Sequence, residues 1–466
     1  MNRQRECIHP QGRLAWVIGA PALVGALAAC GGTSQDTPVQ EPESSESQEI
    51  DDPALERLVT EPGYRDPQVV VDWNEIGVAT AAEVDDFRTF LGHRTMPLAH
   101  LAIHDALNAI VPVYEPYAYT GTDPEADPTI AVSQAAHDVL VEAYPDHAAS
   151  LGELLEHYLA AASDQDAAER GVEVGSAAAA AIIEQRADDR WQSDNDYVPG
   201  DEPGEYRMTP HPALDEPIGR GWGDTEPLTM ASPDQFRPGP PPALSSETYA
   251  ADFNEVKQLG RKDSEERTED QTHIGYWFAE YPTVAYPDVA GARILQDDVH
   301  LWRAARLFAL LAIDNFDGLV SVFDAKYAYN FWRPYHGIRA AEQDGNSETQ
   351  ADRDWEPEMV TAPHPDYPAA LSTLCGGGSV VLKEELGNIP FSRESGSAPE
   401  GTPAERSYDT IDAAVEDCVM SRIYNGFHFR TGLEVGLDMG EERAHHMLEN
   451  YLTRQIDSTH PDLADF

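Results

Sequence analysis

The sequence predicts an all-α protein, a large helical-bundle domain built from two packed helical halves. Apolar residues recur at intervals of three and four over several long segments, as they do along one face of a helix. Runs of alternating apolar and polar residues long enough for a sheet are missing from the sequence. About 400 residues remain for folding after the N-terminal segments, which is enough for one large core or two fused bundles.

Residues 1–29 are predicted to be a lipoprotein signal peptide. Arg3, Arg5 and Arg13 precede an apolar run from Leu14 to Ala29, and a small-residue cleavage box leads into Cys30. The run of about 16 residues is short for a helix that spans a bilayer, which favours cleavage over an uncleaved anchor. Lipidation of Cys30 would then tether an exported bacterial protein to a membrane, on its periplasmic or cell-surface side.

Residues 30–65 are rich in Ser, Gln, Glu, Asp and Pro and lack apolar periodicity, which predicts a disordered acidic tether. The folded domain is expected to occupy residues 66–466. Its N-terminal half is predicted at about 66–186 and its C-terminal half at 245–466. Between them, residues 187–244 form a Pro-, Gly- and Asp-rich linker without helical periodicity.

The net charge of −52, with 31 Lys and Arg against 83 Asp and Glu, excludes nucleic acid as a partner. Repulsion between this many like charges is tolerable in concentrated salt, where the ions screen each charge over a short distance. We therefore hypothesise a halophilic, salt-adapted source, with an ordinary acidic surface as the alternative. Under weak screening the field of the whole molecule would repel small anions.

Several stretches show helical periodicity, and two of them deliver basic residues. Residues 98–110, 139–143 and 171–185 are expected to be helical, as are 301–323, which lead to Lys326, and 411–423, which contain Arg422. His100 and His104 share one helical face among Leu and Ala residues. This pattern favours core-facing histidines satisfied by hydrogen bonds over metal ligands. Glycines at 376–378, 436 and 440 are interpreted as sites of close helix packing.

Four residues in two motifs are candidates for an oxyanion site. Lys326 and Arg333 lie seven residues apart, and Pro334 predicts that the helix ends at Arg333 so that this side chain swings back toward the lysine. Arg422 and His428 flank Asn425-Gly426, a helix stop after which His428 can fold back. Fixed cationic donors match anionic oxygens, and an imidazole can ligate the central atom or attack it.

The order K-x6-R-P, then a motif at 368–371, then S-R-x5-H resembles the signature shared by vanadium-dependent haloperoxidases and the type 2 phosphatidic acid phosphatase superfamily. Segments 96–110, 131–140 and 267–271 resemble the bacterial haloperoxidase-like branch. The resemblance implies a vanadate cofactor, with His428 as the vanadium ligand. Lys326, Arg333, Arg422 and the amide of Ala370 would hold the oxyanion. It also implies that the linker 187–244 lies over the pocket.

One motif departs from the family. Where the family has Pro-Ser-Gly-His, this chain has Pro368-Ala369-Ala370-Leu371. The resemblance assigns acid-base catalysis to the position of Leu371, which cannot exchange a proton. His364 and His336 are nearby in the sequence and are candidate replacements, although packing or capping is the favoured explanation for both. Cys375 and Cys418 are either a disulfide or two buried thiols.

The leading hypothesis is an exported lipoprotein that oxidises halide with hydrogen peroxide at a His-ligated vanadate, impaired by the loss of the acid-base histidine. The first alternative is a phosphatase-like hydrolase in which His428 forms a phosphohistidine. The second is a non-catalytic protein that binds vanadate, phosphate or a similar anion.

Overall fold

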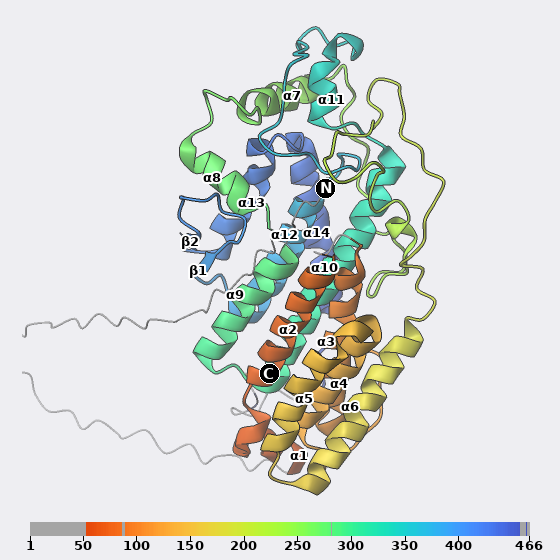
Figure 1. The fold of residues 1–466 in the computed structure, drawn as a ribbon, viewed down its shortest axis with the longest axis vertical. Coiled ribbons are helices and arrows are strands. Elements are labelled where there is room, and N and C mark those ends of the chain that lie inside the picture. Colours follow the sequence, from red (N-terminus) through yellow and green to blue (C-terminus); the bar gives the residue numbers. More distant parts are fainter. Residues whose placement is uncertain (1–52, 86–88, 281, 457–462, 464–466) are drawn as a thin grey trace, which may run out of the picture. The chain divides into compact units, whose positions relative to one another are not determined.

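The structure, a computed structural model, describes residues 53–85, 89–280, 282–456 and 463. The predicted signal peptide, Cys30 and most of the predicted tether lie outside these residues. The described chain consists of helices, long loops and one two-stranded hairpin (Figure 1), which confirms the all-α class. Within the same residues, none of the helices combines the length and the apolarity that a membrane crossing requires.

The N-terminal half is a group of helices around α3. Its long elements are α1 (Pro53–Thr60), α2 (Gln68–Asp85), α3 (Leu91–Ile110), α4 (Pro128–Ala143), α5 (Ala148–Ala161) and α6 (Gln165–Gln185), with 3-10 turns η1 (Pro62–Tyr64) and η2 (Pro145–His147). Capping side chains fix where several of these helices begin. At the start of α4, for example, the side chain of Asp127 accepts a hydrogen bond from the amide of Ile130, and Pro128 lies in the first helical turn. Helix α3 packs against α4, α6 and α10, so the periodic residues at 98–110 face the core as predicted.

The C-terminal half surrounds the long helix α10. Its elements are η3 (Trp222–Asp224), α7 (Glu247–Leu259), α8 (Glu269–Trp277), α9 (Pro282–Asp297), α10 (Leu301–Tyr329), α11 (Pro334–Arg339), η4 (Ala341–Gln343), α12 (Ala370–Leu386), β1 (Phe391–Glu394), β2 (Glu405–Tyr408), α13 (Ile411–Tyr424) and α14 (Arg430–Asn450). Helix α10 is buried along nearly its whole length and contacts both α3 and α12 (Figure 1). It therefore joins the two halves in one core.

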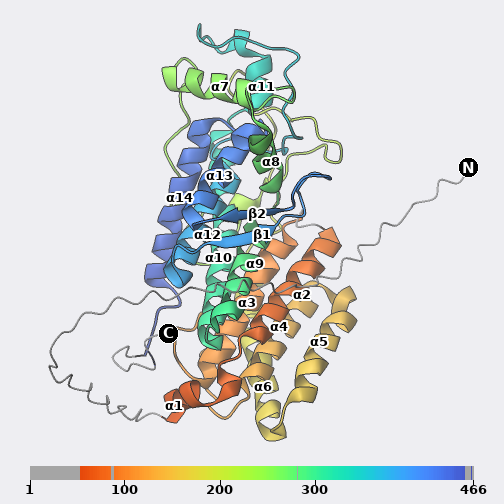
Figure 2. The same cartoon turned by 90° about the vertical axis from the view of Figure 1, so that its left-hand side faces the viewer.

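Helices α12 and α14 approach closely along a line of glycines (Figure 2). A Cβ on Gly436 would lie 2.7 Å from the carbonyl oxygen of Ala369, and one on Gly376 would lie 2.6 Å from that of Leu437. Neither distance leaves room for a side chain, so the predicted close packing at these glycines is confirmed. The contact fixes the first turn of α12, which carries Ala370 and Leu371.

The strands β1 and β2 pair antiparallel, with Phe391 opposite Tyr408 and Glu394 opposite Glu405. Four residues of alternation in each strand are too few to stand out in the sequence.

The folded chain begins earlier than predicted. Residues 53–64, which the sequence assigned to the tether, form α1 and η1. Leu58 is fully buried, and the ring of Tyr64 stacks on Trp302 at 5.4 Å. Burial of these apolar side chains offsets the cost of ordering residues 53–64.

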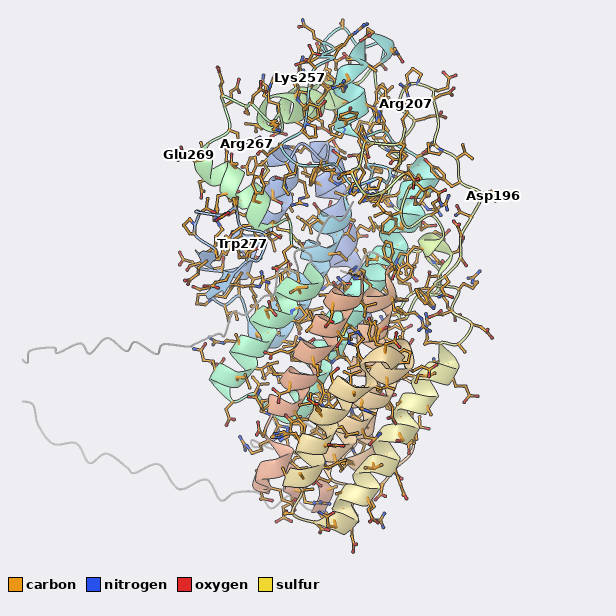
Figure 3. The ribbon with its side chains drawn as sticks, in the orientation of Figure 1. Asp196, Arg207, Lys257, Arg267, Glu269 and Trp277 are labelled. Atoms are coloured by element: carbon orange, nitrogen blue, oxygen red, sulfur yellow. A yellow bond between two sulfur atoms is a disulfide. The ribbon has the colours of Figure 1, made fainter. Side chains whose placement is uncertain are left out.

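The linker 187–244 has little regular structure beyond η3, and Figure 3 marks Asp196 and Arg207 on it. Its backbone is bonded to segments on both sides of the candidate site. The amide of Tyr206 donates to the carbonyl of Asn330 at 2.8 Å, and that of Ile218 to Pro363 at 3.0 Å. The linker therefore lies against these segments.

The histidines of α3 are buried and bonded within the core. Nε2 of His100 lies 3.1 Å from Oδ1 of Asn74, and Nε2 of His104 lies 3.1 Å from the carbonyl oxygen of Glu115. Their interpretation as core residues is confirmed, although only Nε2 of each ring is hydrogen-bonded and both Nδ1 atoms are buried without a hydrogen-bond partner.

Burial lowers the pKa of His100 to about 3, and it lowers the pKa of His104 to about 4 against an opposing hydrogen bond from the backbone of Glu115. Both side chains titrate near 6.5 in an unfolded chain. The unfolded state therefore binds more protons below that pH, and the free energy of unfolding falls as the pH drops from about 6.5 toward 4. We expect that the slope of the unfolding free energy against pH, measured by denaturant unfolding, corresponds to about one fewer proton taken up on unfolding in His100→Gln than in the wild type. The exposed His157→Gln variant should keep the wild-type slope, and an unchanged slope in His100→Gln would contradict the prediction.

Candidate oxyanion-binding site

Two helices place Lys326 and Arg333. Lys326 lies in the last turn of α10, which ends at Tyr329 because Asn330 adopts a left-handed conformation (φ 51°). The prediction that this helix continues to Arg333 is wrong by four residues, since Asn330 reverses the chain before Pro334 can act. Arg333 instead has extended backbone and caps the start of α11. The two side chains still meet, because the chain turns back between them.

Both cations are buried and bound mainly to backbone carbonyls. Nζ of Lys326 donates to the carbonyl oxygens of Pro365 at 2.9 Å and Asp366 at 2.8 Å. Arg333 donates from Nε to the carbonyl of His364 at 2.8 Å and from one terminal nitrogen to that of Phe427 at 2.9 Å. Burial and the neighbouring Arg333 hold the pKa of Lys326 well below its usual range, although Asp366 acts in the opposite direction.

His428 faces the guanidinium of Arg333. Helix α13 ends at Tyr424, and Gly426 takes the left-handed conformation (φ 76°) that the Asn-Gly stop predicts. The chain then returns, and Nε2 of His428 lies 2.8 Å from a terminal nitrogen of Arg333. Burial, followed by the charges of Arg333 and Lys326, holds the pKa of His428 well below its usual range, so the ring is neutral.

Asp366 completes the cluster and was missed in the sequence. Its Oδ1 lies 3.0 Å from Nδ1 of His428 and 3.8 Å from Arg333, and its side chain is 1% exposed. Burial raises the pKa of this carboxyl to about 7, against the opposing effect of Arg333 and Lys326. The only sequence signal is its place between His364 and Tyr367, just before the altered motif. Among 83 acidic residues that position is inconspicuous.

The two cations keep spare donors. A guanidinium and an ammonium carry eight N–H groups between them. Within the described residues, four of them meet carbonyls and two meet the rings of His428 and His364. By this count, one N–H of Lys326 and at most one of Arg333 have no partner among these residues, since the second terminal nitrogen of Arg333 lies 3.0 and 3.2 Å from the two ring nitrogens of His364.

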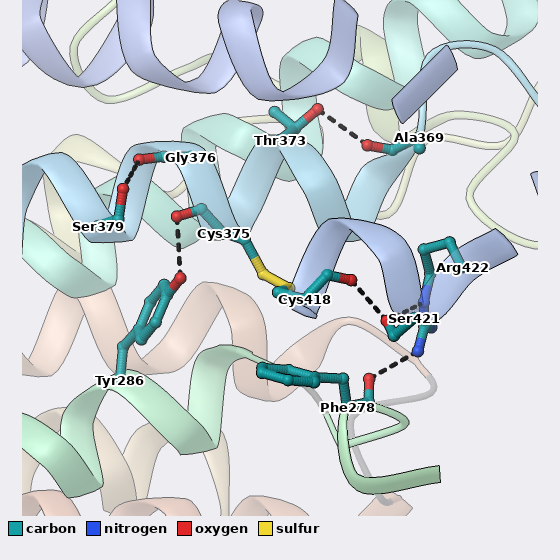
Figure 4. Close-up of a disulfide and its surroundings, with 10 residues drawn as sticks. All are labelled: Phe278, Tyr286, Ala369, Thr373, Cys375, Gly376, Ser379, Cys418, Ser421 and Arg422. Carbon is teal, nitrogen blue, oxygen red and sulfur yellow. Dashed lines mark hydrogen bonds between the residues drawn. A yellow bond between two sulfur atoms is a disulfide. The ribbon is translucent and has the colours of Figure 1, made fainter. Parts of the chain in front are cut away.

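Arg422 stands apart from this cluster. It donates from Nε to Oγ of Ser421 at 3.0 Å and from a terminal nitrogen to the carbonyl of Phe278 at 2.7 Å (Figure 4). Its guanidinium also lies over the ring of Phe427, 5.3 Å from the centroid. It acts on His428 through its charge, as the smallest of the effects that lower the pKa of that ring. The structure thus brings Arg333 and His428 into contact, with the charges of Lys326 and Arg422 close enough to lower the pKa of the His428 ring.

The altered motif lies at the start of α12. The amide of Ala369 donates to the carbonyl of Gly432 at 2.9 Å, so this residue is anchored to the segment that follows His428. Ala370 and Leu371 form the first turn of the helix and are only partly buried. Leu371 leaves no proton-exchanging group at this position.

The two candidate replacements for the lost histidine differ in location. The ring of His364 lies 3.0–3.2 Å from Arg333, and its Nδ1 lies 3.1 Å from the carbonyl oxygen of Pro365. His336 lies on α11, where Arg207 and Arg339 are the charges that lower its pKa after burial. Only His364 belongs to the cluster.

A disulfide ties two of the site-bearing helices. Cys375 of α12 is bonded to Cys418 of α13, four residues before Arg422 (Figure 4). The pairing that the sequence left open is therefore formed in the structure.

Closing a separation of 43 residues stabilises a fold by about 4 kcal/mol in the chain-entropy model. We expect the Cys375→Ala/Cys418→Ala double variant to lose on that order of unfolding free energy in denaturant titration. Reduction of the wild-type protein should have the same effect. Equal midpoints for the double variant and the oxidised wild type would contradict this.

The start of α8 supports the other end of α13. Arg267, marked in Figure 3 beside Glu269, donates to the carbonyl oxygen of Tyr424 at 3.0 Å and pairs with Glu358. Thr268 and Gln271 form a capping box on α8. The 267–271 segment thus holds the end of α13 from which the loop to His428 leaves.

Comparison with known proteins agrees with this architecture. Residues 306–456 match the family model described as the VCPO second helical-bundle domain. A bacterial vanadium-dependent iodoperoxidase structure is 22% identical, with a TM-score of 0.72 over 86% of this chain and 100% of the other. An apo-type bacterial vanadium-dependent chloroperoxidase is 17% identical, with a TM-score of 0.62 over 78% and 93%. Its holo-type counterpart is 16% identical, with 0.63 over 84% and 94%. No curated protein matches the sequence.

The chain therefore has the fold of the vanadium haloperoxidases, and residues 306–456 span all the site segments described above. The matching domain and the shared fold make the chain similar to the vanadium haloperoxidases.

The donor set fits a vanadate-like oxyanion. Lys326 and Arg333 supply buried N–H groups, and Nε2 of His428 lies on the Arg333 side of its ring, 2.8 Å from a terminal nitrogen. Two features depart from the family pattern: Ala369 has no hydroxyl, and Leu371 has no exchangeable proton. The site is thus equipped to hold an anion and lacks its proton donor.

Proposed function

We propose that this protein is an exported, vanadium-dependent haloperoxidase-like enzyme of reduced activity, which oxidises a halide with hydrogen peroxide. The observation that carries the proposal is the cluster of Lys326, Arg333 and His428, buried in the domain that matches the family model. Vanadate, when bound, supplies the activation of peroxide and the oxidation of halide. The chain supplies its position and the neutralisation of its charge.

Each residue has a separate task in this proposal. Nε2 of His428 is the ligand atom, and an anion bound there displaces the N–H that Arg333 now directs at this nitrogen. Lys326 and Arg333 neutralise the charge of the vanadate oxygens. Arg422 adds a third positive charge nearby without direct contact with Lys326 or Arg333. Ala370 can contribute its backbone amide at the start of α12. Without a proton donor at 371, the proton needed during turnover comes from water or another group, which explains the reduced activity.

The test is bromination of monochlorodimedone by the purified mature protein with peroxide, with and without vanadate. We expect slow turnover that requires added vanadate and disappears in His428→Ala. The exposed His157→Ala variant should retain the wild-type rate. Turnover that is independent of vanadate, or no binding in a vanadate titration with elemental analysis, would overturn the proposal.

A phosphohydrolase is the second candidate, and one observation favours it. A buried carboxylate oxygen of Asp366 lies 3.0 Å from Nδ1 of His428, close enough to stabilise the positive charge that a nucleophilic imidazole develops. Hydrolysis of p-nitrophenyl phosphate, blocked by vanadate, would support this reaction. Tight binding of vanadate or phosphate without either turnover would instead identify a non-catalytic oxyanion-binding protein.

The acidity of the chain leads to a salt-dependence prediction. With a net charge of −52, the field that repels vanadate is screened over about 10 Å at 0.1 M salt but only about 3 Å at 1 M. We expect vanadate affinity to rise with sodium chloride over this range in equilibrium dialysis. A steadily falling affinity would contradict salt adaptation.

We further propose that Cys30 is lipidated and anchors the exported protein to a membrane. The support is the basic and apolar order of residues 1–29 and the cleavage box before Cys30. Incorporation of labelled fatty acid and recovery in the membrane fraction test this, and both should be lost in Cys30→Ala. Label retained by that variant would contradict it.

A further inference from the structure

The disulfide between Cys375 and Cys418 ties a peripheral helix to a central one. Helix α12 is buried along most of its length and packs closely on α14 and α10. Helix α13 is buried only in part and divides its apolar side chains between two clusters. Val415 belongs to the main core, whereas Ala414 belongs to a second, smaller cluster with Trp277. The position of α13 therefore depends on how it is joined to α12.

The two helices run antiparallel, so their site-bearing ends lie on the same side of the disulfide. Lys383 pairs with Asp412 at one end, and the bond between Cys375 and Cys418 lies closer to the start of α12 and the end of α13. Beyond it come the first turn of α12 and Arg422 (Figure 4). The side chains of the ion pair are 30% and 58% exposed, so it is screened by solvent and weak. The disulfide is the stronger tie and the one next to the site.

A chain of hydrogen bonds leads from the disulfide to Arg422. Oγ of Ser421 donates to the carbonyl oxygen of Cys418 at 2.5 Å, and Nε of Arg422 donates to Oγ of Ser421 at 3.0 Å (Figure 4). A terminal nitrogen of Arg422 donates to the carbonyl of Phe278 at 2.7 Å. The loop to His428 leaves from the same end of α13. A shift of α13 would therefore move Arg422 and the start of this loop together.

We propose that formation of the Cys375–Cys418 disulfide is a maturation step of the oxyanion site, which sets α13 on α12 and without which the site binds an oxyanion weakly. The inference deepens the proposed function and rests on it for the guest and for export. Thiols stay reduced in the cytoplasm, whereas exported compartments favour disulfides. The two thiols transfer two electrons and two protons to the disulfide of an exchange partner, which leaves as a dithiol. The chain thus gains its full affinity after export.

Burial makes this step one-directional. Cys375 is 2% exposed and Cys418 is 1% exposed. The exchange partner must therefore reach the thiols before α12 and α13 close on one another, because exchange requires access to the sulfur atoms. Once the bond is buried, a reductant reaches it only when α13 opens.

The first test compares the vanadate Kd of the oxidised protein with that of Cys375→Ala/Cys418→Ala in equilibrium dialysis, at a temperature where circular dichroism shows both to be folded. We expect the Kd to rise by about 10–100-fold in the variant, the effect of losing one hydrogen bond to a charged group. Lys383→Met removes the exposed tie between the same two helices and should keep the wild-type Kd. Equal values in the oxidised protein and the folded double variant would overturn the proposal.

Hydrogen exchange separates an effect on the site from a general loss of stability. In the double variant we expect faster exchange in peptides that cover α13 and residues 425–428, while α3 stays as protected as in the wild type. If α3 exchanges faster to the same extent, the disulfide supports the whole fold rather than the site, and the proposal fails. A double variant that does not fold gives that same result.

Failure of this proposal and failure of the proposed function give different results. Oxidised protein that binds neither vanadate nor phosphate would refute the proposed function, and the exchange pattern would still decide the role of the disulfide. Equal vanadate binding by the oxidised protein and the folded double variant would refute the maturation step and leave the proposed function intact.

Discussion

Replacing Leu371 with histidine is expected to raise vanadate-dependent bromination by about 10²–10⁴-fold, the usual contribution of a positioned general acid-base. Leu371 occupies the position at which the family signature has its histidine. It is only partly buried, so an imidazole can be accommodated without loss of core packing. The first turn of α12 is held by the anchored amide of Ala369 and the close approach of Gly436. The new side chain would thus be presented from a fixed backbone.

Leu371→Gln is the matched control, because it adds hydrogen-bonding atoms at this position without a titratable nitrogen. We expect its rate to remain near that of the wild type. Equal rates in Leu371→His and the wild type would contradict the idea that the missing acid-base limits turnover. Such a result would have one of two meanings. Either another residue already supplies the proton, for which His364 in the cluster is the candidate, or this chemistry does not occur here.

The helices were predictable because their apolar periodicity is long. The segments at 98–110 and 301–323 are buried almost throughout, and 411–423 is buried in part. The turn after α13 follows from the local Asn425-Gly426 pair, in which Gly426 takes a positive φ. The end of α10 was misplaced because Asn330 and Pro334 both carry stop signals, and the sequence does not show which acts first. The burial of Leu58 and Tyr64 depends on Trp302, more than two hundred residues away, so the start of the fold was also misplaced.

The candidate site was predictable in its cations and not in its acid. Lys326, Arg333 and His428 were recognisable because they lie at fixed spacings within short sequence motifs. Asp366 enters through tertiary packing, and nothing in its neighbourhood separates it from a solvated aspartate. The direction in which Arg422 points is likewise decided by the carbonyl of Phe278, on a segment distant in the chain. Such contacts depend on the assembled fold.

Arg333→Lys is expected to destabilise the protein by about 1–3 kcal/mol for each buried acceptor that loses its donor, because a lysine keeps the charge but not the five N–H groups of the guanidinium. The guanidinium of Arg333 is buried and reaches the carbonyls of His364 and Phe427 and the rings of both histidines at once. A single ammonium cannot reproduce that planar fork. Vanadate binding should weaken with it, because the ammonium cannot present the donors of the guanidinium in the same geometry. Denaturant unfolding and a vanadate titration measure both effects.

Arg430→Lys is the control for the arginine-to-lysine change itself. Arg430 pairs with Glu255 at a site where its side chain is 34% exposed, so we expect a loss of at most about 1 kcal/mol. Removing both partners in the cluster should also be informative. Arg333→Met combined with Asp366→Leu spares the cost of an uncompensated buried carboxylate, so the double variant should lose less stability than the sum of the two single variants. Additive losses would mean that the two charges, 3.8 Å apart, do not depend on one another.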